Sequence, residues 1–203
     1  VSSFNSLSDF NKQKLNWVSC NNNFQCSSFL VPIDYENLKS GTFKLALLRH
    51  RASNSALRIG SLVVNPGGPG GSGIDFAYNY ENMFSISIIN SFDIVGFDGR
   101  GIGQSQQIRC LDDKAEDSFI NLDGSAKTPS ELKNLVSASK SFAAACSRAA
   151  GSKIAHISTL ETAKDMEILR NLLGDARLNY LGKSYGTYLG AIYISLFPDK
   201  VCL

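Results

Sequence analysis

Short, almost wholly apolar runs alternate along the chain with longer segments of helical periodicity. The runs at 29–33 and 42–51 are separated by a polar segment containing a glycine, which predicts an antiparallel hairpin. The runs at 62–64, 94–97 and 178–181 are short and nearly free of polar residues, and glycine or proline follows each closely. We therefore expect three strands buried on both faces of a parallel sheet.

The helix signals are clearer than the strand signals. The segment Thr-Pro-Ser-Glu at 128–131 combines a capping box with proline at the first helical position, and apolar residues then recur at helical spacing up to Gly151. A second amphipathic helix is expected over 158–174 and a third over 188–197. Residues 1–28 are rich in serine and asparagine and predict an irregular lead-in.

Buried strands that alternate with helices predict an α/β fold. The chain has 203 residues, 43% of them hydrophobic, which suffices for one sizeable core and is short for two independent domains. We find no internal repeat, and residues 111–150 are expected to form a helical excursion beside the sheet. The excursion carries an acidic cluster that we interpret as solvated surface and not as a metal site: Asp112, Asp113, Glu116 and Asp117.

Charge and hydropathy give no reason to expect a charged polymer or a membrane as partner. Lys and Arg number 20 against 18 for Asp and Glu, so the formal net charge of +2 predicts no binding to nucleic acid. No apolar run approaches the roughly 18 residues that span a bilayer. The N-terminus begins with Val1 and shows no secretory leader, but a processed chain would show none either, so this gives no argument for the cytoplasm.

The cysteines lack the CxxC spacing of zinc and redox sites. We expect Cys20 and Cys26 to bridge a short polar loop and Cys110 and Cys146 to fasten the excursion, with Cys202 left over. Free buried thiols are the alternative. Disulfides would indicate an exported protein.

The pentapeptide GKSYG at 182–186 matches GxSxG and lies between the expected strand and the expected helix. In that context Ser184 occupies a sharp strand-to-helix turn, where its hydroxyl can act as a nucleophile. Only 19 residues follow Ser184, and none of them is histidine. His50 and His156 both precede it, and we interpret them as surface or locally hydrogen-bonded side chains and not as the catalytic base.

The glycine-rich loop at 65–73 follows the strand at 62–64 and can present bare backbone amides. An oxyanion hole needs one amide from the residue after the nucleophile, here Tyr185, and one from a loop after an earlier strand. Gly68 is the candidate for this second donor, with Gly67 as the fallback.

The same loop contains GxGxxG at 68–73, and Asp98 ends the next strand, where a ribose-binding acid could lie. This is the pattern of a dinucleotide site. Pro66 and Pro69 each remove an amide that a pyrophosphate could use, and the GxSxG would stay unexplained, so we expect no nucleotide cofactor. No GK[ST] follows, which argues against a P-loop.

The segment DGRGIGQS at 98–105 follows another strand and is expected at the same edge of the sheet. Asp98 and Arg100 could be catalytic. We favour a structural role, in which they hold the loop through local hydrogen bonds and an ion pair.

These segments together resemble a known family. The sequences NPGGPGGSG at 65–73, FDIVGFDGRGIGQS at 92–105 and LNYLGKSYGTYLGAIYISLFPDKV at 178–201 are similar to secreted α/β-hydrolase fold peptidases of the tripeptidyl aminopeptidase and prolyl aminopeptidase group, particularly its actinobacterial exported branch. VPIDY at 31–35 and the paired cysteines extend the resemblance to nearly the whole chain.

The resemblance implies an exopeptidase that removes short peptides or single residues from free N-termini without a cofactor. Ser184 would be the nucleophile, and the amides of Gly68 and Tyr185 the oxyanion donors. In the family the acid and the histidine lie downstream of this serine, in the order Ser, Asp, His, with a cap between them that selects the amino terminus of the substrate.

The downstream parts of the family are not found here. We therefore expect an incomplete α/β-hydrolase fold, in which residues 1–203 supply the hairpin, the parallel strands up to the nucleophile and its helix, while later strands and the cap are absent. Residues 200–203 also depart from the family, which continues from this helix into another strand. An apolar strand edge would stay unpaired, so we expect aggregation or a partner there, either the missing C-terminal part or another chain.

The leading hypothesis is the nucleophile-bearing portion of a secreted or cell-envelope serine aminopeptidase, inactive by itself because its acid and histidine are absent. A non-catalytic fragment or binding module of the same fold is the alternative from another class. An esterase is the third hypothesis, because the cap that would separate the two substrate classes is not in the sequence.

Overall fold

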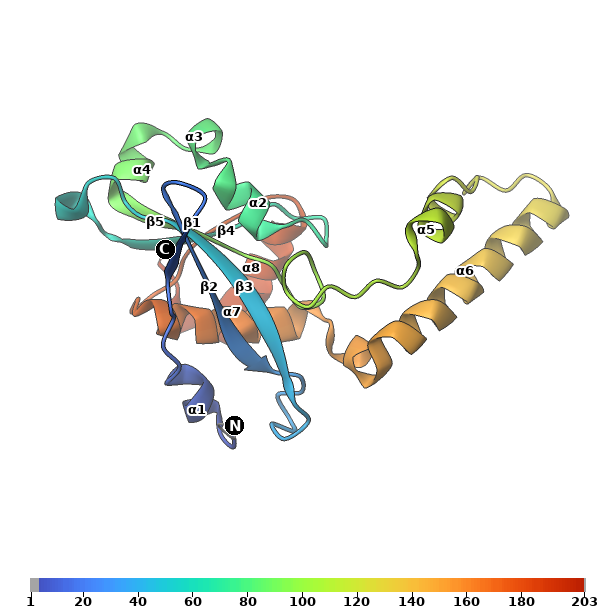
Figure 1. Ribbon diagram of the computed structural model, residues 1–203, viewed down its shortest axis with the longest axis horizontal. Helices are drawn as coiled ribbons and strands as arrows, with labels where there is room; N and C mark the ends of the chain where they lie inside the picture. The colour runs from blue at the N-terminus through green and yellow to red at the C-terminus, as the bar shows by residue number, and fades with distance from the viewer. Residues whose placement is uncertain (1–3, 203) are drawn as a thin grey trace. The chain divides into compact units, whose positions relative to one another are not determined.

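The computed structural model describes residues 4–202, which divide into two compact units. The sheet unit comprises the residues up to Gln107 and those from Ile157 onward, and the helical unit comprises Ile108–His156. Figure 1 shows the strands and their covering helices in the first unit and a pair of helices in the second. None of the helices in the described part of the chain is long and apolar enough to cross a membrane.

Within the described residues, one mixed sheet has the strand order β1-β2-β3-β5-β4-β6. The predicted hairpin is confirmed, since β2 and β3 pair antiparallel. The three predicted parallel strands are also confirmed, since Val63 of β4 lies opposite Val95 of β5 on one side and Tyr180 of β6 on the other. The strands are β1 (Val18–Cys20), β2 (Phe24–Pro32), β3 (Thr42–His50), β4 (Gly60–Asn65), β5 (Phe92–Phe97) and β6 (Asn179–Gly182).

The prediction of an irregular lead-in over residues 1–28 was wrong in part, and residues 1–3 of that segment lie outside the described residues. A short helix, α1 (Leu7–Asn11), and β1 precede β2, which begins at Phe24 and not at residue 29. Asn21 and Asn22 have positive φ angles of 44° and 58°, which turn β1 back onto β2. Asn21 and Asn22, which suggested irregular structure, therefore form this turn, and Ser27 and Ser28 lie within β2.

Helices cover both faces of the sheet (Figure 1). On one face α7 (Thr159–Leu173) and α8 (Tyr185–Leu196) pack against a core that includes Val63 and Val95. On the other face α2 (Gly73–Tyr78), α3 (Tyr80–Met83) and α4 (Ile86–Ser91) pack with Leu62, Val64 and Ile94. Successive residues of β4 thus point into opposite cores, which is why the run at 62–64 contains no polar position.

Helix α2 packs directly on β5 through two glycines. A Cβ at Gly73 would overlap the backbone carbonyl of Phe97, and a Cβ at Gly96 would overlap the carbonyl oxygen of Gly73 and lie 2.7 Å from Cβ of Ala77. The last glycine of the GxGxxG pattern therefore has a packing role. Its presence needs no nucleotide to explain it.

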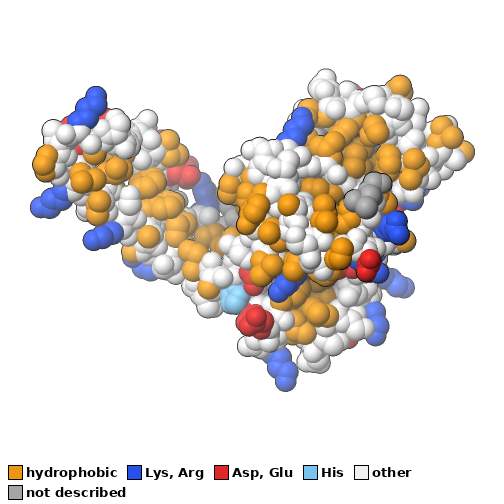
Figure 2. Space-filling view, turned by 180° about the vertical axis from the view of Figure 1, so that it is seen from behind, with side chains coloured by type: hydrophobic (Ala, Val, Ile, Leu, Met, Phe, Trp, Pro, Cys, Tyr) orange, Lys and Arg blue, Asp and Glu red, His pale blue; other side chains and the backbone are white. Residues whose placement is uncertain are grey.

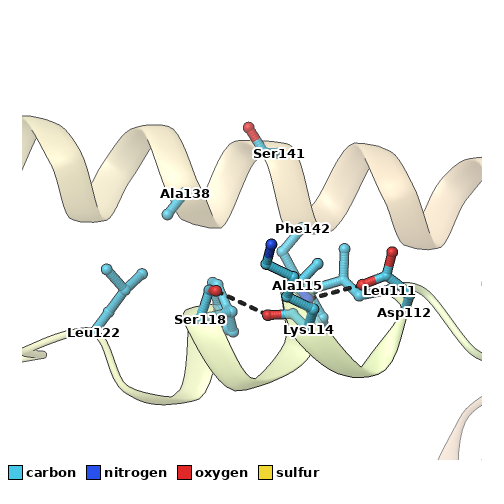
Figure 3. Close-up of a pocket in the computed structure, with 10 residues that line it drawn as sticks. Leu111, Asp112, Lys114, Ala115, Ser118, Leu122, Ala138, Ser141 and Phe142 are labelled. Carbon is cyan, nitrogen blue, oxygen red and sulfur yellow. Dashed lines mark hydrogen bonds between the residues drawn. The ribbon is translucent and has the colours of Figure 1, made fainter.

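The helical unit consists of α5 (Asp113–Ile120), α6 (Pro129–Ala150) and a 3₁₀ segment at Gly151–His156. The capping box at Thr128 is present as predicted, with the amide of Glu131 donating to Thr128 Oγ1. A groove of about 520 Å³ lies between α5 and α6. Figure 3 shows Phe142 and Ala138 of α6 projecting toward α5 there. The rings of Phe119 and Phe142 stack there at 4.6 Å.

The acidic cluster of the helical unit lies on its surface, as predicted. Asp112 caps α5 by accepting from the amide of Ala115, and Asp113 pairs with Arg109 in an ion pair that is largely exposed. Glu116 and Asp117 are exposed as well.

Both predicted disulfides are confirmed. Cys20 is bonded to Cys26 in the sheet unit, and Cys110 is bonded to Cys146 in the helical unit. Cys202 is a free, exposed cysteine. Free thiols at the four bridged positions, which the sequence left open, are thereby excluded.

The outer edge of β6 is only partly covered by the described residues. Leu178 forms a parallel bridge with Val201, and its amide donates to the carbonyl of Lys200 at 2.7 Å. The segment after α8 thus lies beside β6 at Val201, and Leu203, the last of the residues expected to depart from the family, lies outside the described residues. Helix α8 also exposes Tyr188, Ile194 and Leu196, and Figure 2 shows apolar side chains spread over one face of the sheet unit.

Candidate active site

Ser184 lies at the turn between β6 and α8. Its φ angle is 51° and its ψ angle is −124°, so a residue with a side chain holds a backbone conformation that usually requires glycine. Helix α8 begins directly after it, at Tyr185, and not at residue 188 as the sequence predicted. Ser184 is exposed at this turn, so its hydroxyl can reach a bound molecule.

The two glycines of GxSxG are required by close backbone contacts. A Cβ at Gly182 would overlap the carbonyl of Gly186, and a Cβ at Gly186 would lie 2.9 Å from Oδ1 of Asn65. The turn can therefore close only when neither position carries a side chain. The pentapeptide thus forms a strained strand-to-helix turn of the kind that can present a nucleophile.

The glycine-rich loop after β4 packs against this turn. Gly67 is buried, and a Cβ there would lie 2.9 Å from Cβ of Ser184 and 3.1 Å from the amide nitrogen of Tyr185. The backbone amide of Lys183 donates to the carbonyl of Asn65 at 3.0 Å. The loop and the turn, more than 100 residues apart in the chain, therefore form one site.

The amides of this site differ in whether they are already bonded. The amide of Gly67 donates to Oδ1 of Asn65 at 2.9 Å, and the amide of Gly71 donates to the carbonyl of Gly67 at 3.0 Å. Within residues 4–202, the amides of Gly68 and Tyr185 have no hydrogen-bond partner. The two amides predicted as oxyanion donors are thus available to a ligand, whereas the fallback, Gly67, is not.

A cleft of about 420 Å³ borders the turn and the loop. Tyr185, the residue after Ser184, forms part of its wall. The hydroxyl of Tyr185 lies 2.7 Å from Oγ1 of Thr159 at the start of α7. The lining residues come from the glycine loop, the segment after β5 and the first turns of α7 and α8: Asn65, Gly67, Pro69, Gly70, Gly71, Gly99, Arg100, Ile102, Ile157, Ser158, Thr159, Thr162, Tyr185 and Leu189.

Asp98 holds the loop together, as the structural interpretation predicted. One carboxylate oxygen accepts from the hydroxyl of Ser72 at 2.7 Å and the other accepts from the amide of Gln104 at 2.9 Å. Asp98 is also buried, with 1% of its surface exposed. Its carboxylate is therefore used within the protein and is not available to a ribose hydroxyl.

Arg100 is buried too, and its ion-pair partner was missed by the sequence analysis. Its Nε and one terminal nitrogen donate to the two carboxylate oxygens of Asp165 on α7, at 2.6 and 2.7 Å. Its guanidinium also donates to the carbonyls of Ile33 and Pro32, and the hydroxyl of Tyr35 donates to Asp165. The only sign of this partner in the sequence was that Asp165, an acid, stands among the apolar positions of α7 that face the core.

Burial and pairing both act on the pKa values in this network, and burial raises the pKa of the Asp165 carboxyl group. Burial acts to lower the pKa of Arg100, but the hydrogen bonds and charge of Asp165 outweigh it and raise that pKa. Burial also raises the pKa of Tyr35, which keeps its hydroxyl protonated as a donor. Arg100 and Asp165 therefore join the loop after β5 to α7 and support one wall of the cleft.

The structure does not place His50 in the cleft. Its ring is buried and stacks on Tyr80 at 3.9 Å, in the core on the face of the sheet covered by α2–α4. Burial lowers the pKa of His50. The other histidine, His156, belongs to the helical unit.

Comparison with known proteins covers most of the chain. It is 37% identical over 180 residues to tripeptidyl aminopeptidase of Streptomyces lividans, which covers 87% of this chain and 34% of that protein. It is 35% identical over 178 residues to serine protease Hip1 of Mycobacterium tuberculosis, with 87% and 34% coverage. It is also 37% identical over 149 residues to carboxylesterase B of Mycobacterium tuberculosis, with 72% and 28% coverage.

The chain spans about a third of the length of the curated relatives it matches. Among solved structures, a proline iminopeptidase-related protein from Thermus thermophilus is similar with a TM-score of 0.44 and 17% identity, over 85% of this chain and 41% of that one. The family described as alpha/beta hydrolase fold matches residues 60–202. These residues contain the glycine-rich loop at 65–73, the strands after it and the turn at 182–186 that carries Ser184, which we call the elbow. The chain belongs to the alpha/beta hydrolase fold family.

Proposed function

We propose that this chain is the nucleophile-bearing portion of a serine exopeptidase that releases short peptides or single residues from free N-termini. The observation that carries the proposal is the exposed Ser184 on a strained strand-to-helix turn against which the glycine-rich loop packs, with the amides of Gly68 and Tyr185 left without a hydrogen-bond partner among residues 4–202. The similarity to a tripeptidyl aminopeptidase and to a serine protease supports the peptidase class.

The proposed chemistry is acyl transfer through Ser184. Its Oγ attacks the scissile carbonyl while a general base takes the hydroxyl proton, and the carbonyl oxygen becomes an oxyanion. The amides of Gly68 and Tyr185 donate to that oxyanion, and the N-terminus of α8 favours its negative charge. The amine then leaves with the proton, and water hydrolyses the acyl-enzyme.

We propose that the general base and its acid come from sequence beyond these 203 residues. His50 is buried against Tyr80, so it cannot serve Ser184 without rearranging a core. The relatives are about three times as long as the aligned segment, which leaves room for both groups. The partly uncovered edge of β6 is where the rest of the hydrolase, or another chain, would pair.

An esterase is the second candidate function. The similarity to carboxylesterase B favours it, because the elbow and the oxyanion amides serve ester and amide substrates alike. The substrate class is therefore decided by the residues that cover the cleft.

Two disulfides in a chain of this size are consistent with an oxidising, extracellular environment. We propose a location in the cell envelope or the external medium. Proteinase accessibility of the chain on intact cells tests this location directly, and protection until the cells are lysed would contradict it.

The test of the function combines a phosphonate probe with two substrates. In the hydrolase that contains this chain, a serine-directed phosphonate should modify Ser184, as located by peptide mass spectrometry, and Ser184→Ala should abolish both labelling and turnover. A tripeptide arylamide with a free amino terminus should be cleaved, and its N-acetylated form should not. Turnover of aryl esters without any turnover of the arylamide would assign the esterase function instead, and labelling of another residue would refute the nucleophile.

A further inference from the structure

Asn65 lies at the end of β4, where the sheet gives way to the glycine-rich loop. Its side-chain Oδ1 accepts from the amide of Gly67 at 2.9 Å, and its backbone carbonyl accepts from the amide of Lys183 at 3.0 Å. The first bond shapes the loop and the second holds the elbow. A single residue therefore contacts both halves of the oxyanion site.

The side chain of Asn65 also lies against the far side of the elbow. A Cβ added to Gly186 would lie 2.9 Å from Oδ1 of Asn65 and 3.0 Å from its carbonyl oxygen. Because this contact leaves no free space, a change in the position of Asn65 displaces the first turn of α8. The amide of Tyr185 belongs to that turn.

The hydrogen bond to Gly67 decides which loop amide is available. Gly67 contacts the elbow closely, with its φ angle at 99°, so Gly67 and Gly68 are the two residues of the loop to compare as donors. Asn65 occupies the amide of Gly67, while the amide of Gly68 has no partner within residues 4–202. The hydrogen bond needs an acceptor oxygen on the side chain at position 65, so a side chain without one would leave the amide of Gly67 unbonded.

We propose that Asn65 is a positioning residue for the oxyanion hole: it fastens the glycine loop to the elbow and, by binding the amide of Gly67, leaves Gly68 and Tyr185 as the two donors. The inference rests on the proposed function for its catalytic meaning. Asparagine suits the role because its side-chain oxygen accepts a hydrogen bond from the loop but carries no charge. Aspartate would bring a negative charge next to the oxyanion. The side chain acts through the two amides and does not itself contact the reacting atoms.

The first test is amide hydrogen exchange of the whole chain, measured by NMR. The amide of Gly67 should be protected, and those of Gly68 and Tyr185 should exchange rapidly. Asn65→Ala should remove the protection of Gly67, whereas Asn65→Asp, which keeps the acceptor oxygen, should retain it. Exchange of Gly67 as fast as that of Gly68 in the unaltered chain would overturn the inference, whether or not the protein is a hydrolase.

The second test uses the phosphonate adduct of Ser184, whose phosphoryl oxygen mimics the oxyanion. On forming the adduct, the amide protons of Gly68 and Tyr185 should shift downfield, and that of Gly67 should stay in place. Asn65→Ala should slow labelling on the order of a hundredfold, because the donors are displaced from the oxyanion position. Asn65→Ser, with a shorter acceptor, should recover part of the rate, which a loss of folding would not allow.

The outcomes separate the inference from the proposed function. A shift at Gly67 in place of Gly68, or labelling at the unaltered rate in Asn65→Ala, would overturn the role of Asn65 while leaving Ser184 as the nucleophile. Absence of labelling in the complete hydrolase would refute the proposed function, and the exchange measurement would still decide whether Asn65 holds the loop.

Discussion

The sheet unit and the helical unit are stabilised by different means. In the sheet unit, apolar side chains from both faces of the sheet are buried between helices, and charged groups such as Arg100 and Asp165 are enclosed with them. In the helices of the helical unit only Ala145 and Ala150 are buried, and Cys110–Cys146 joins α6 to the segment before α5. The candidate chemistry lies on the unit with the large core, as expected where a strained turn must be held rigid.

The contrast shows that helix signals in the sequence do not tell how firmly a helix is held by packing. Helix α6 has better capping signals than α8, yet its apolar face has few partners within its own unit. Helix α8 lacks a side-chain cap and is fixed by packing of Leu189 and Tyr193 in the core. Packing, and not propensity, determines which helix can position a nucleophile.

The largest expected effect comes from comparing a buried ion pair with an exposed one. Arg100→Met leaves Asp165 buried without its main partner, so it should lower the free energy of unfolding of the sheet unit by about 3–5 kcal/mol. Arg109→Met removes the exposed pair with Asp113 in the helical unit and should cost less than about 1 kcal/mol. Urea denaturation of both variants measures the difference. Equal losses in the free energy of unfolding would show that burial does not decide how much these two ion pairs contribute.

Removing the disulfide of the helical unit should have the next largest effect. Cys110 and Cys146 are 36 residues apart, so replacing both with serine should destabilise that unit by about 4 kcal/mol on the chain-entropy estimate. Amide exchange should then become fast along α6 while β4 and β5 stay protected. The matched control, Cys20→Ser with Cys26→Ser, opens a loop of only 6 residues in the sheet unit and should leave α6 unaffected. Loss of protection in both units at once would contradict separate stabilisation.

A glycine pair provides a smaller test of packing. Gly96→Ala would push a methyl group into Gly73 and Ala77 and should destabilise the sheet unit by about 2–3 kcal/mol. Gly124→Ala, where the added carbon meets no atom within 4 Å, should change stability by less than about 0.5 kcal/mol. Thermal unfolding of both variants checks this, and a neutral Gly96→Ala would refute the backbone contact between α2 and β5.

The smallest effect concerns pH and the buried histidine. Because burial lowers the pKa of His50 below its ordinary value of 6.5, the unfolded chain binds a proton that the folded chain does not as the pH falls through 6.5. His50 therefore contributes stability at pH 7 that is lost toward pH 5. His50→Phe, which keeps a ring against Tyr80, should flatten this part of the pH profile of unfolding. An unchanged profile would show that His50 does not titrate differently on folding.

Much of the fold and part of the site could be predicted from local patterns. The run at 62–64, the capping box at Thr128 and the GxSxG around Ser184 each depend on neighbours in sequence, and each was located correctly. The hairpin, both disulfides and the structural role of Asp98 were also predicted. These features share short sequence separation or a strong residue preference.

The features that were missed leave no clear mark in the local sequence pattern. Asp165 lies 65 residues from Arg100, and nothing in the local pattern of α7 names its partner. Gly68 was the first candidate donor, but the hydrogen bond from the amide of Gly67 to Asn65 was not predicted, because a run of glycines does not show which of its amides is already bonded. The strand that begins at Phe24 was hidden because its serines occupy positions where a polar residue is tolerated.

The rate at which a phosphonate labels Ser184, with and without the rest of the hydrolase, tests the central claim most directly. With the described geometry but no base identified within the chain, the isolated chain should be labelled slowly and only at Ser184, and supplying the remainder should accelerate labelling by at least about a hundredfold. Fast labelling of the isolated chain at the same rate would show that a group within these residues already activates the serine. Labelling at any other residue would contradict the assignment of the nucleophile.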